Sequence, residues 1–195
     1  RYTPLLYYAG KITQPEELAQ KNMRKFMKIL LVKRLESSFH AFRKSLERFL
    51  ASYEQFLREY DKGDVYVSKE YTNKLFELLE DDDDEAIQRL IDEDKARRYS
   101  ASDFDPKFKE YLENDLAVLK EVAKLWLTID RDPKLLTFVD ILQKNETLKK
   151  NKLIVFTESK ETAEYLESNL SKIFPHKVLC FSGSSGAPTR DKVIA

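Results

Sequence analysis

The chain has 195 residues, and its 34 Lys and Arg side chains balance 34 Asp and Glu side chains. A hydrophobic fraction of 42% is enough to bury a core, and a charged fraction of 35% with four glycines and six prolines is typical of a soluble, helix-rich protein. Because glycine occurs only at 10, 63, 183 and 186, neither the phosphate loop GxxxxGK[ST] nor the dinucleotide fingerprint GxGxxG can be written.

Cysteine and histidine are too few for a disulfide framework or a zinc finger, since the chain has one cysteine and two histidines far apart. A lone thiol suits a reducing compartment, so we expect a cytoplasmic protein. No apolar run approaches the roughly 20 residues of a membrane span, and we expect no membrane partner.

The neutral total hides an uneven distribution of charge. Residues 1–60 carry 12 basic and 6 acidic side chains (+6), residues 61–130 carry 11 and 20 (−9), and residues 131–195 carry 11 and 8 (+3). Neutrality therefore says little about a nucleic-acid partner. Because the chain starts at Arg1 and stops at Ala195 within an expected helix, we expect it to be a piece of a longer protein.

A long helix is predicted from Pro15 to Tyr60, a stretch without glycine or further proline. Pro15 in its first turn and Asp61-Lys62-Gly63 after its last are good helix boundaries. Its apolar residues are spaced alternately by four and three positions, which is an a/d seam held for more than three heptads: Leu35, Phe39, Phe42, Leu46, Phe49, Tyr53, Phe56 and Tyr60.

The partner for this seam is predicted between Asp105 and Ile129, where apolar residues again repeat at three- and four-residue spacing. Asp105 is a plausible helix cap, Pro106 lies in the first turn, and Trp126 is expected to anchor the core. The two stretches are expected to pack antiparallel as a helical hairpin, which forms a first domain of residues 1–130.

The tip of the hairpin is expected at about residues 62–104. Two short helices are predicted there, at Lys69–Glu80 and Asp84–Lys95, while Val65-Tyr66-Val67 is too short to assign. The acidic run Asp81–Asp84 lacks the alternation and glycine of a calcium loop, so a solvated turn is expected rather than a cation site.

A second domain, residues 131–195, has a different pattern. Lys134–Gln143 is predicted to be a short amphipathic helix, and Ser159–Phe174 a second helix that Ser159 caps. Lys152–Thr157 and Lys177–Phe181 are predicted to be buried strands, and strand, helix, strand with short links indicates a right-handed parallel βαβ unit. Two parallel strands do not complete a domain, so more of the sheet is expected beyond the last residue. The expected fold class is α/β, predominantly α.

Several segments resemble superfamily 2 helicases. Residues 152–166 (KLIVFTESKETAEYL) resemble motif IV, at the start of the second RecA-like lobe, and residues 181–185 (FSGSS) with Arg190–Ile194 resemble the motif IVa region. Asp132–Leu135 is similar to the segment that opens this lobe in Swi/Snf-like translocases. Residues 30–43 (LLVKRLESSFHAFR) resemble a signature of bacterial helicases of that type, where it lies in a helical insertion between the lobes.

The resemblance implies a fragment of an ATP-driven motor on duplex DNA or, as the weaker alternative, of an RNA helicase. ATP and Mg are implied as cofactors of the intact protein. The family's phosphate loop, its acidic metal-binding motif and the motifs with the arginine finger fall outside residues 1–195. We therefore expect no ATP hydrolysis by this fragment, and assign it neither a catalytic residue nor a cofactor.

Candidate nucleic-acid contacts lie where each predicted strand meets the following helix. Unpaired N–H groups at a helix N-terminus suit a phosphate, and in a parallel sheet both places share the carboxyl edge. Hydroxyls, amides and one lysine follow a backbone without reading bases. Thr157 and Ser159 have the alternative of simply ending a strand and capping a helix. The full candidate set, which the resemblance places on one DNA strand, is Thr157, Ser159, Lys160, Ser182, Gly183, Ser184 and Arg190.

Two broader alternatives stay open. The basic groups Lys33-Arg34 and Arg43-Lys44-Arg48 form either a phosphate-facing stripe or a flank that pairs with the acidic segment 61–130, and the charge balance favours the second. The chain as a whole is alternatively a protein-interaction module whose working surface is the hairpin and its tip. A polar seam together with a tip that exposes Phe76 or Leu79 would favour that interpretation.

Overall fold

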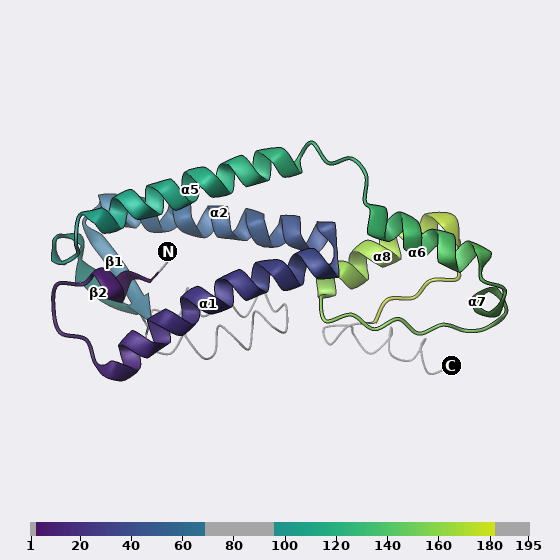
Figure 1. The fold of residues 1–195 in the computed structure, drawn as a ribbon, viewed down its shortest axis with the longest axis horizontal. Helices are drawn as coiled ribbons and strands as arrows, with labels where there is room; N and C mark the ends of the chain where they lie inside the picture. The colour runs from purple at the N-terminus through teal and green to yellow at the C-terminus, as the bar shows by residue number, and fades with distance from the viewer. Residues whose placement is uncertain (1–2, 69–95, 182–195) are drawn as a thin grey trace.

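A computed structural model describes residues 3–68 and 96–181 (Figure 1). Three long helices, α1, α2 and α5, make an elongated bundle, with a small sheet at one end and a second helical group at the other. The fold of the described residues is mainly α, as predicted. None of the described helices has the length and apolar character needed to cross a membrane.

The described elements follow one another with short connections. In chain order they are η1 (Pro4–Tyr7), α1 (Gln14–Ser37), α2 (Phe39–Asp61), β1 (Asp64–Ser68), β2 (Ala96–Ser100), η2 (Ala101–Asp103), α5 (Lys107–Trp126), α6 (Pro133–Lys144), α7 (Glu146–Lys150) and α8 (Lys160–Ile173).

The prediction of one continuous helix from Pro15 to Tyr60 is wrong, because the helix breaks at Ser38. Ser38 has an extended backbone, and its N–H closes α1 by donating to the Arg34 carbonyl at 3.1 Å. Its hydroxyl caps α2 by accepting the N–H of Ala41 at 3.0 Å. A serine that supplies its own acceptor competes with helix continuation. As a result, α1 and α2 pack against each other instead of forming one rod (Figure 1).

Helices α2 and α5 pack antiparallel, as predicted for the hairpin. Phe56 near the end of α2 meets Phe108 near the start of α5, with ring centroids 5.7 Å apart. Phe42 near the start of α2 meets Trp126 at the end of α5, at 4.5 Å. Trp126 is half-buried and joins α5 to the first turn of α2, but it lies outside the main hydrophobic core.

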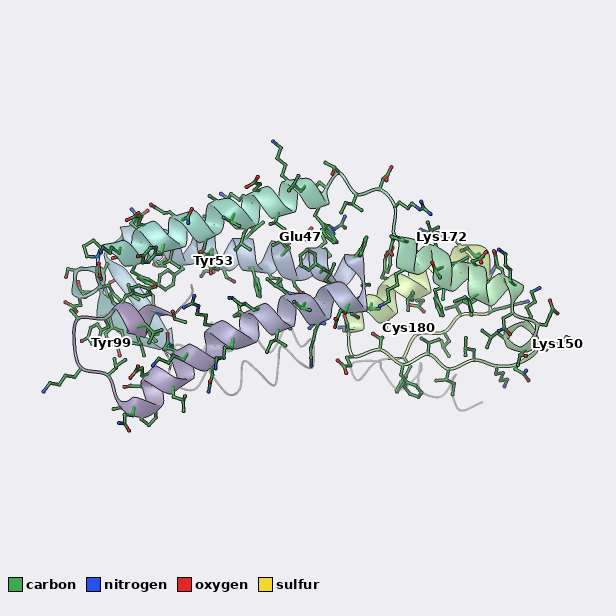
Figure 2. The ribbon with its side chains drawn as sticks, viewed as in Figure 1. Glu47, Tyr53, Tyr99, Lys150, Lys172 and Cys180 are labelled. Atoms are coloured by element: carbon green, nitrogen blue, oxygen red, sulfur yellow. The ribbon has the colours of Figure 1, made fainter. Side chains whose placement is uncertain are left out.

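The main hydrophobic core lies at the sheet end of the bundle. There β1 and β2 pair antiparallel with Val65 opposite Tyr99, so the stretch too short to assign from sequence is a strand. Tyr53 and Tyr99 mark this end of the molecule in Figure 2. Buried side chains from the bundle, the sheet and the N-terminal segment form the core: Leu5, Tyr53, Phe56, Leu57, Val65, Val67, Phe104, Phe108 and Leu112.

The predicted tip helices lie outside the described residues. This applies to Lys69–Glu80, to Asp84–Lys95 and to the acidic run Asp81–Asp84 between them. The sheet β1–β2 is the described part of the tip.

The two helices predicted in the second domain are confirmed as α6 and α8, and Ser159 caps α8 by accepting the N–H of Thr162. The two predicted buried strands are not formed in the described residues. Lys152–Thr157 and Lys177–Phe181 are neither helical nor paired, and the side chain of Phe156 is 89% exposed. An apolar run becomes a buried strand only where neighbouring strands pair with it and helices cover it, which the described residues do not provide.

Candidate functional site

A polar junction connects the bundle to α8 at the break between α1 and α2. It gathers charged and hydroxyl side chains from three helices and their caps. We define the junction by Arg34, Ser37, Ser38, Arg48, Ser159, Glu161 and Thr162.

Glu161, in the first turn of α8, binds two arginines from the bundle. Its Oε1 accepts from Arg48 at 2.5 Å, and its Oε2 accepts from Arg34 at 3.4 Å and from the Ser159 hydroxyl at 3.1 Å. Side-chain exposure is 13% for Glu161 and 6% for Arg34. Burial alone would raise the pKa of Glu161, but the hydrogen bond and charge of Arg48 and the charge of Arg34 outweigh it, so this pKa is lowered. The carboxylate is therefore ionised at neutral pH.

Thr162 links the two ends of the break to α8. Its Oγ1 lies 2.7 Å from the Ser37 hydroxyl and 2.8 Å from the Ser38 hydroxyl. Thr162 and Ser38 are buried, so the hydrogen bond between them forms away from water, whereas the bond to Ser37 is only partly buried. Lys134 of α6 adds a cation at the end of α1, donating to the carbonyls of Glu36 and Ser37.

An aromatic contact extends the junction along α8. The rings of His40 and Tyr165 stack with centroids 5.0 Å apart and an interplanar angle of 4°. The Tyr165 hydroxyl donates to Asp132 at 3.1 Å, and burial followed by the Asp132 charge raises the pKa of Tyr165 to about 12. The pKa of His40 is lowered, first by burial and then by Arg43 and Lys44. A neutral, stacked imidazole packs the interface between α2 and α8.

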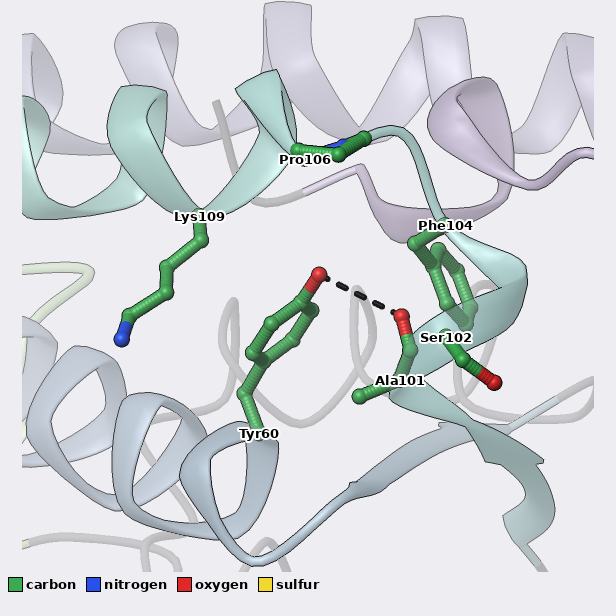
Figure 3. A pocket seen from close by; sticks show the side chains of 6 residues that line it. All are labelled: Tyr60, Ala101, Ser102, Phe104, Pro106 and Lys109. Carbon is green, nitrogen blue, oxygen red and sulfur yellow. Dashed lines mark hydrogen bonds between the residues drawn. The ribbon is translucent and has the colours of Figure 1, made fainter.

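Two pockets differ in what they offer. One, of about 250 Å³, opens beside the junction between Ser37, Lys134 and Phe156. The other, of about 360 Å³, lies at the sheet end between Tyr60, Phe104 and their neighbours (Figure 3). There the Tyr60 hydroxyl donates to the Ala101 carbonyl at 3.3 Å, and nearby Lys109 pairs with Asp61 at 2.7 Å. Because the Tyr60 hydroxyl and the Lys109 ammonium group each already have a partner, we interpret this pocket as a packing gap at the edge of the core and not as a reactive site.

The described candidates for DNA contact meet at the start of α8. Thr157 is exposed, and its hydroxyl accepts the N–H of Ser159 at 3.3 Å. Lys160 is exposed in the first helical turn. Ser159, by contrast, is only 2% exposed, and its hydroxyl caps α8 and binds Glu161. The other candidates lie outside the described residues: Ser182, Gly183, Ser184 and Arg190.

The basic flank of the bundle has partners that sequence reasoning missed. Arg34 and Arg48 bind Glu161 of α8. Arg43 and Lys44 lie near Glu47 of their own helix, at 3.6 and 3.4 Å. The spacing of residues along the chain does not predict the ion pairs of Arg34 and Arg48 with Glu161. The resemblance to helicases did mark a segment on each side of the junction, residues 30–43 in the bundle and residues 152–166 at the start of α8.

Within residues 3–68 and 96–181 no cluster of His, Cys, Asp or Glu could hold a metal ion. Cys180 lies near α8 (Figure 2), and its N–H donates to Glu167 at 3.2 Å. Burial, with Glu167 and Glu164, raises the pKa of its thiol, which makes it a poor nucleophile at neutral pH.

Comparison with protein-family models, with curated proteins and with solved structures finds no match for this chain. Function must therefore be inferred from the residues and their geometry.

Proposed function

We propose that the chain is part of a Swi/Snf-like ATP-dependent DNA translocase. Residues 1–130 would form a helical insertion, and residues 131–195 would begin the second RecA-like lobe. In the intact cytoplasmic protein, ATP and Mg would close two lobes on the backbone of duplex DNA. This chain would supply backbone contacts and a helical brace, and no group that hydrolyses ATP.

The observation that carries the proposal is that the two segments resembling this family lie against each other. Residues 30–43 supply Ser38 to the junction and residues 152–166 supply Thr162, although these two residues are 124 positions apart. Direct contact supports a common task for the two segments, as expected if the insertion braces the lobe.

The exposed apolar segments support the lobe assignment. Ile154 is 76% exposed and Phe156 89%, with Leu179 and Phe181 about half exposed. Such runs suit the strands of a parallel sheet, which helices cover on both faces. We propose that further strands of the same lobe pair with these segments.

Thr157 and Lys160 are the described side chains best placed to hold a phosphate. Both are exposed where the chain enters α8. Ser159 would contribute indirectly, because its hydroxyl fixes the first turn of the helix. Contacts of this kind grip any sequence, as a motor must.

The proposal is tested by reversing charge at the phosphate site of the intact protein. Lys160→Glu with Ser182→Glu should weaken duplex binding in a filter assay and reduce DNA-stimulated ATPase. Lys172→Glu, at the far end of α8, makes the same charge change as Lys160→Glu alone and should leave both unchanged. Unchanged affinity and ATPase in the double variant would refute the proposal. The flanking reading frame should also encode a phosphate loop upstream and an arginine-rich motif downstream.

The protein-interaction alternative gains no support from the described residues. The α2 seam is apolar, and Leu46, Phe49 and Phe56 are buried. Phe76 and Leu79 lie outside the described residues. Persistent partner binding after deletion of residues 64–103 would exclude the tip as the working surface.

A further inference from the structure

We infer that Glu161 and Thr162 fasten the helical bundle to α8, so that the bundle and the second domain move as one body. The idea that this attachment lets the bundle move with the lobe along DNA rests on the proposed function. The attachment itself follows from the contacts of the junction.

The covalent connection between the two parts cannot hold their orientation. The chain crosses once between α5 and α6 (Figure 1), and in this crossing the side chains of residues 127–131, up to the α6 cap Asp132, are all exposed. Leu127 is 73% exposed although it is apolar. Because this short connection has no buried side chains, the orientation of α6–α8 relative to the bundle depends on non-covalent contacts.

The carboxylate of Glu161 joins three helices at one point. Arg34 comes from α1 and Arg48 from α2, and each donates to a different oxygen of the α8 carboxylate. Charged groups removed from water are costly to separate, so α8 cannot leave both arginines without exposing or stranding them. The same carboxylate also accepts from the cap of its own helix, Ser159.

Thr162 adds a second point of attachment on another side of α8. Consecutive residues of an α-helix are about 100° apart around its axis, so Glu161 and Thr162 together resist rotation of α8 against the bundle. Thr162 also joins two helix caps, because Ser38 caps α2 and Ser159 caps α8. Loss of this threonine hydroxyl would leave the buried Ser38 hydroxyl with one partner fewer.

In the proposed motor, the phosphate contacts of Thr157 and Lys160 would lie at the start of α8, directly before Glu161 and Thr162 in the chain. Movement of the lobe along DNA would then carry the whole bundle with it. The bundle would work as a rigid lever and not as a freely hinged arm.

The inference is tested by a distance measurement on the complete chain. Spin labels at Ala51→Cys in α2 and Lys172→Cys in α8, with Cys180→Ser, report the orientation by pulsed electron paramagnetic resonance. The parent should show one narrow distance distribution, and Glu161→Gln with Thr162→Val should broaden it. The matched control, Glu164→Gln with Thr137→Val, changes exposed groups of the same types and should keep it narrow.

Equal widths in the double variant and its control would overturn the inference, provided that circular dichroism shows the same helix content. If the double variant does not fold, Arg48→Gln is a milder change, since Arg34 still binds Glu161. It should broaden the distribution less, and an unchanged width would again count against the attachment. This measurement needs neither ATP nor DNA, so its failure is distinct from failure of the Lys160 and Ser182 test.

Discussion

Glu161 is an ordinary first-turn carboxylate in the sequence, and its role comes from distant residues. Arg48 and Arg34 precede it by 113 and 127 positions. Ser159 shows the converse, because its sequence position suited both a cap and a DNA contact, and its burial at 2% exposure favours the cap. At the scale of single residues, burial and long-range charge therefore decide which of several chemically reasonable roles is taken.

We predict that the stabilisation from Glu161 is complete at neutral pH and is lost in acid. Its pKa is lowered from 4.5 in the folded protein, so the unfolded chain takes up the proton first and stability falls as pH drops below about 4.5 and through the folded pKa. Glu161→Gln should cost about 2–3 kcal/mol at pH 7, because it leaves buried arginine charge without its carboxylate.

Urea unfolding between pH 3 and 7 measures both effects. The Glu161→Gln curve should be flatter than that of the parent below pH 5, while Glu164→Gln should follow the parent. Parallel curves for the parent and Glu161→Gln would show that the carboxylate contributes nothing specific.

The burial of a helix's apolar face is less uniform in the structure than the sequence pattern predicts, as α5 shows. The spacing in α5 predicts one continuous buried face, yet Phe108 and Leu112 are fully buried while Leu116 and Leu119 on the same face are only partly buried. Among the described elements, the sheet and η1 cover only the first half of α5, and α2 faces the second half. Periodicity identifies which side of a helix can be buried, whereas its neighbours decide how much of that side is covered.

We predict that Phe108→Ala lowers the free energy of unfolding by about 3–5 kcal/mol, since it opens a cavity among the rings of Tyr7, Phe56 and Phe104. Leu125→Ala should change it by no more than about 0.5 kcal/mol, because that side chain is largely in water already. Guanidinium unfolding of the two variants provides the comparison. Equal losses would mean that the core is not confined to the sheet end.

On the scale of the whole molecule, the bundle has a well-covered core, whereas the described residues 131–181 leave much of their apolar surface open. Contiguous apolar side chains of Leu153–Phe156 are exposed, with Leu179 and Phe181 also open to solvent. Exposed patches of this kind mark surfaces that become covered by another chain segment or another molecule.

We therefore predict that the chain self-associates reversibly through this patch. Ile154→Ser with Phe156→Ser should shift the sedimentation coefficient toward the monomer value at high protein concentration, with little change in stability. Val118→Ser, which alters a 52% exposed apolar residue of α5, serves as control. Association that is insensitive to the double variant would place the contact elsewhere.

Local chemistry was enough to predict α5, α6 and α8, because their periodicity and boundary signals involve residues a few positions apart. Asp132 and Ser159 cap α6 and α8 where the sequence places polar residues before apolar periodicity, and the α2–α5 seam is visible as a heptad pattern. The break at Ser38 was missed, because a seam that continues through a serine does not reveal that its hydroxyl caps a new helix.

The strands and the junction depend on partners that are remote in the chain. The apolar run Lys152–Thr157 has the composition of a buried strand, but hydrogen-bonding neighbours and covering helices decide whether it becomes one. Likewise, no spacing rule connects Arg34 and Arg48 to Glu161, since a buried ion pair forms only where folding removes both charges from water at the same place. Short-range hydrogen bonding and periodicity can thus be read along the chain, whereas burial and long-range charge pairing exist only in three dimensions.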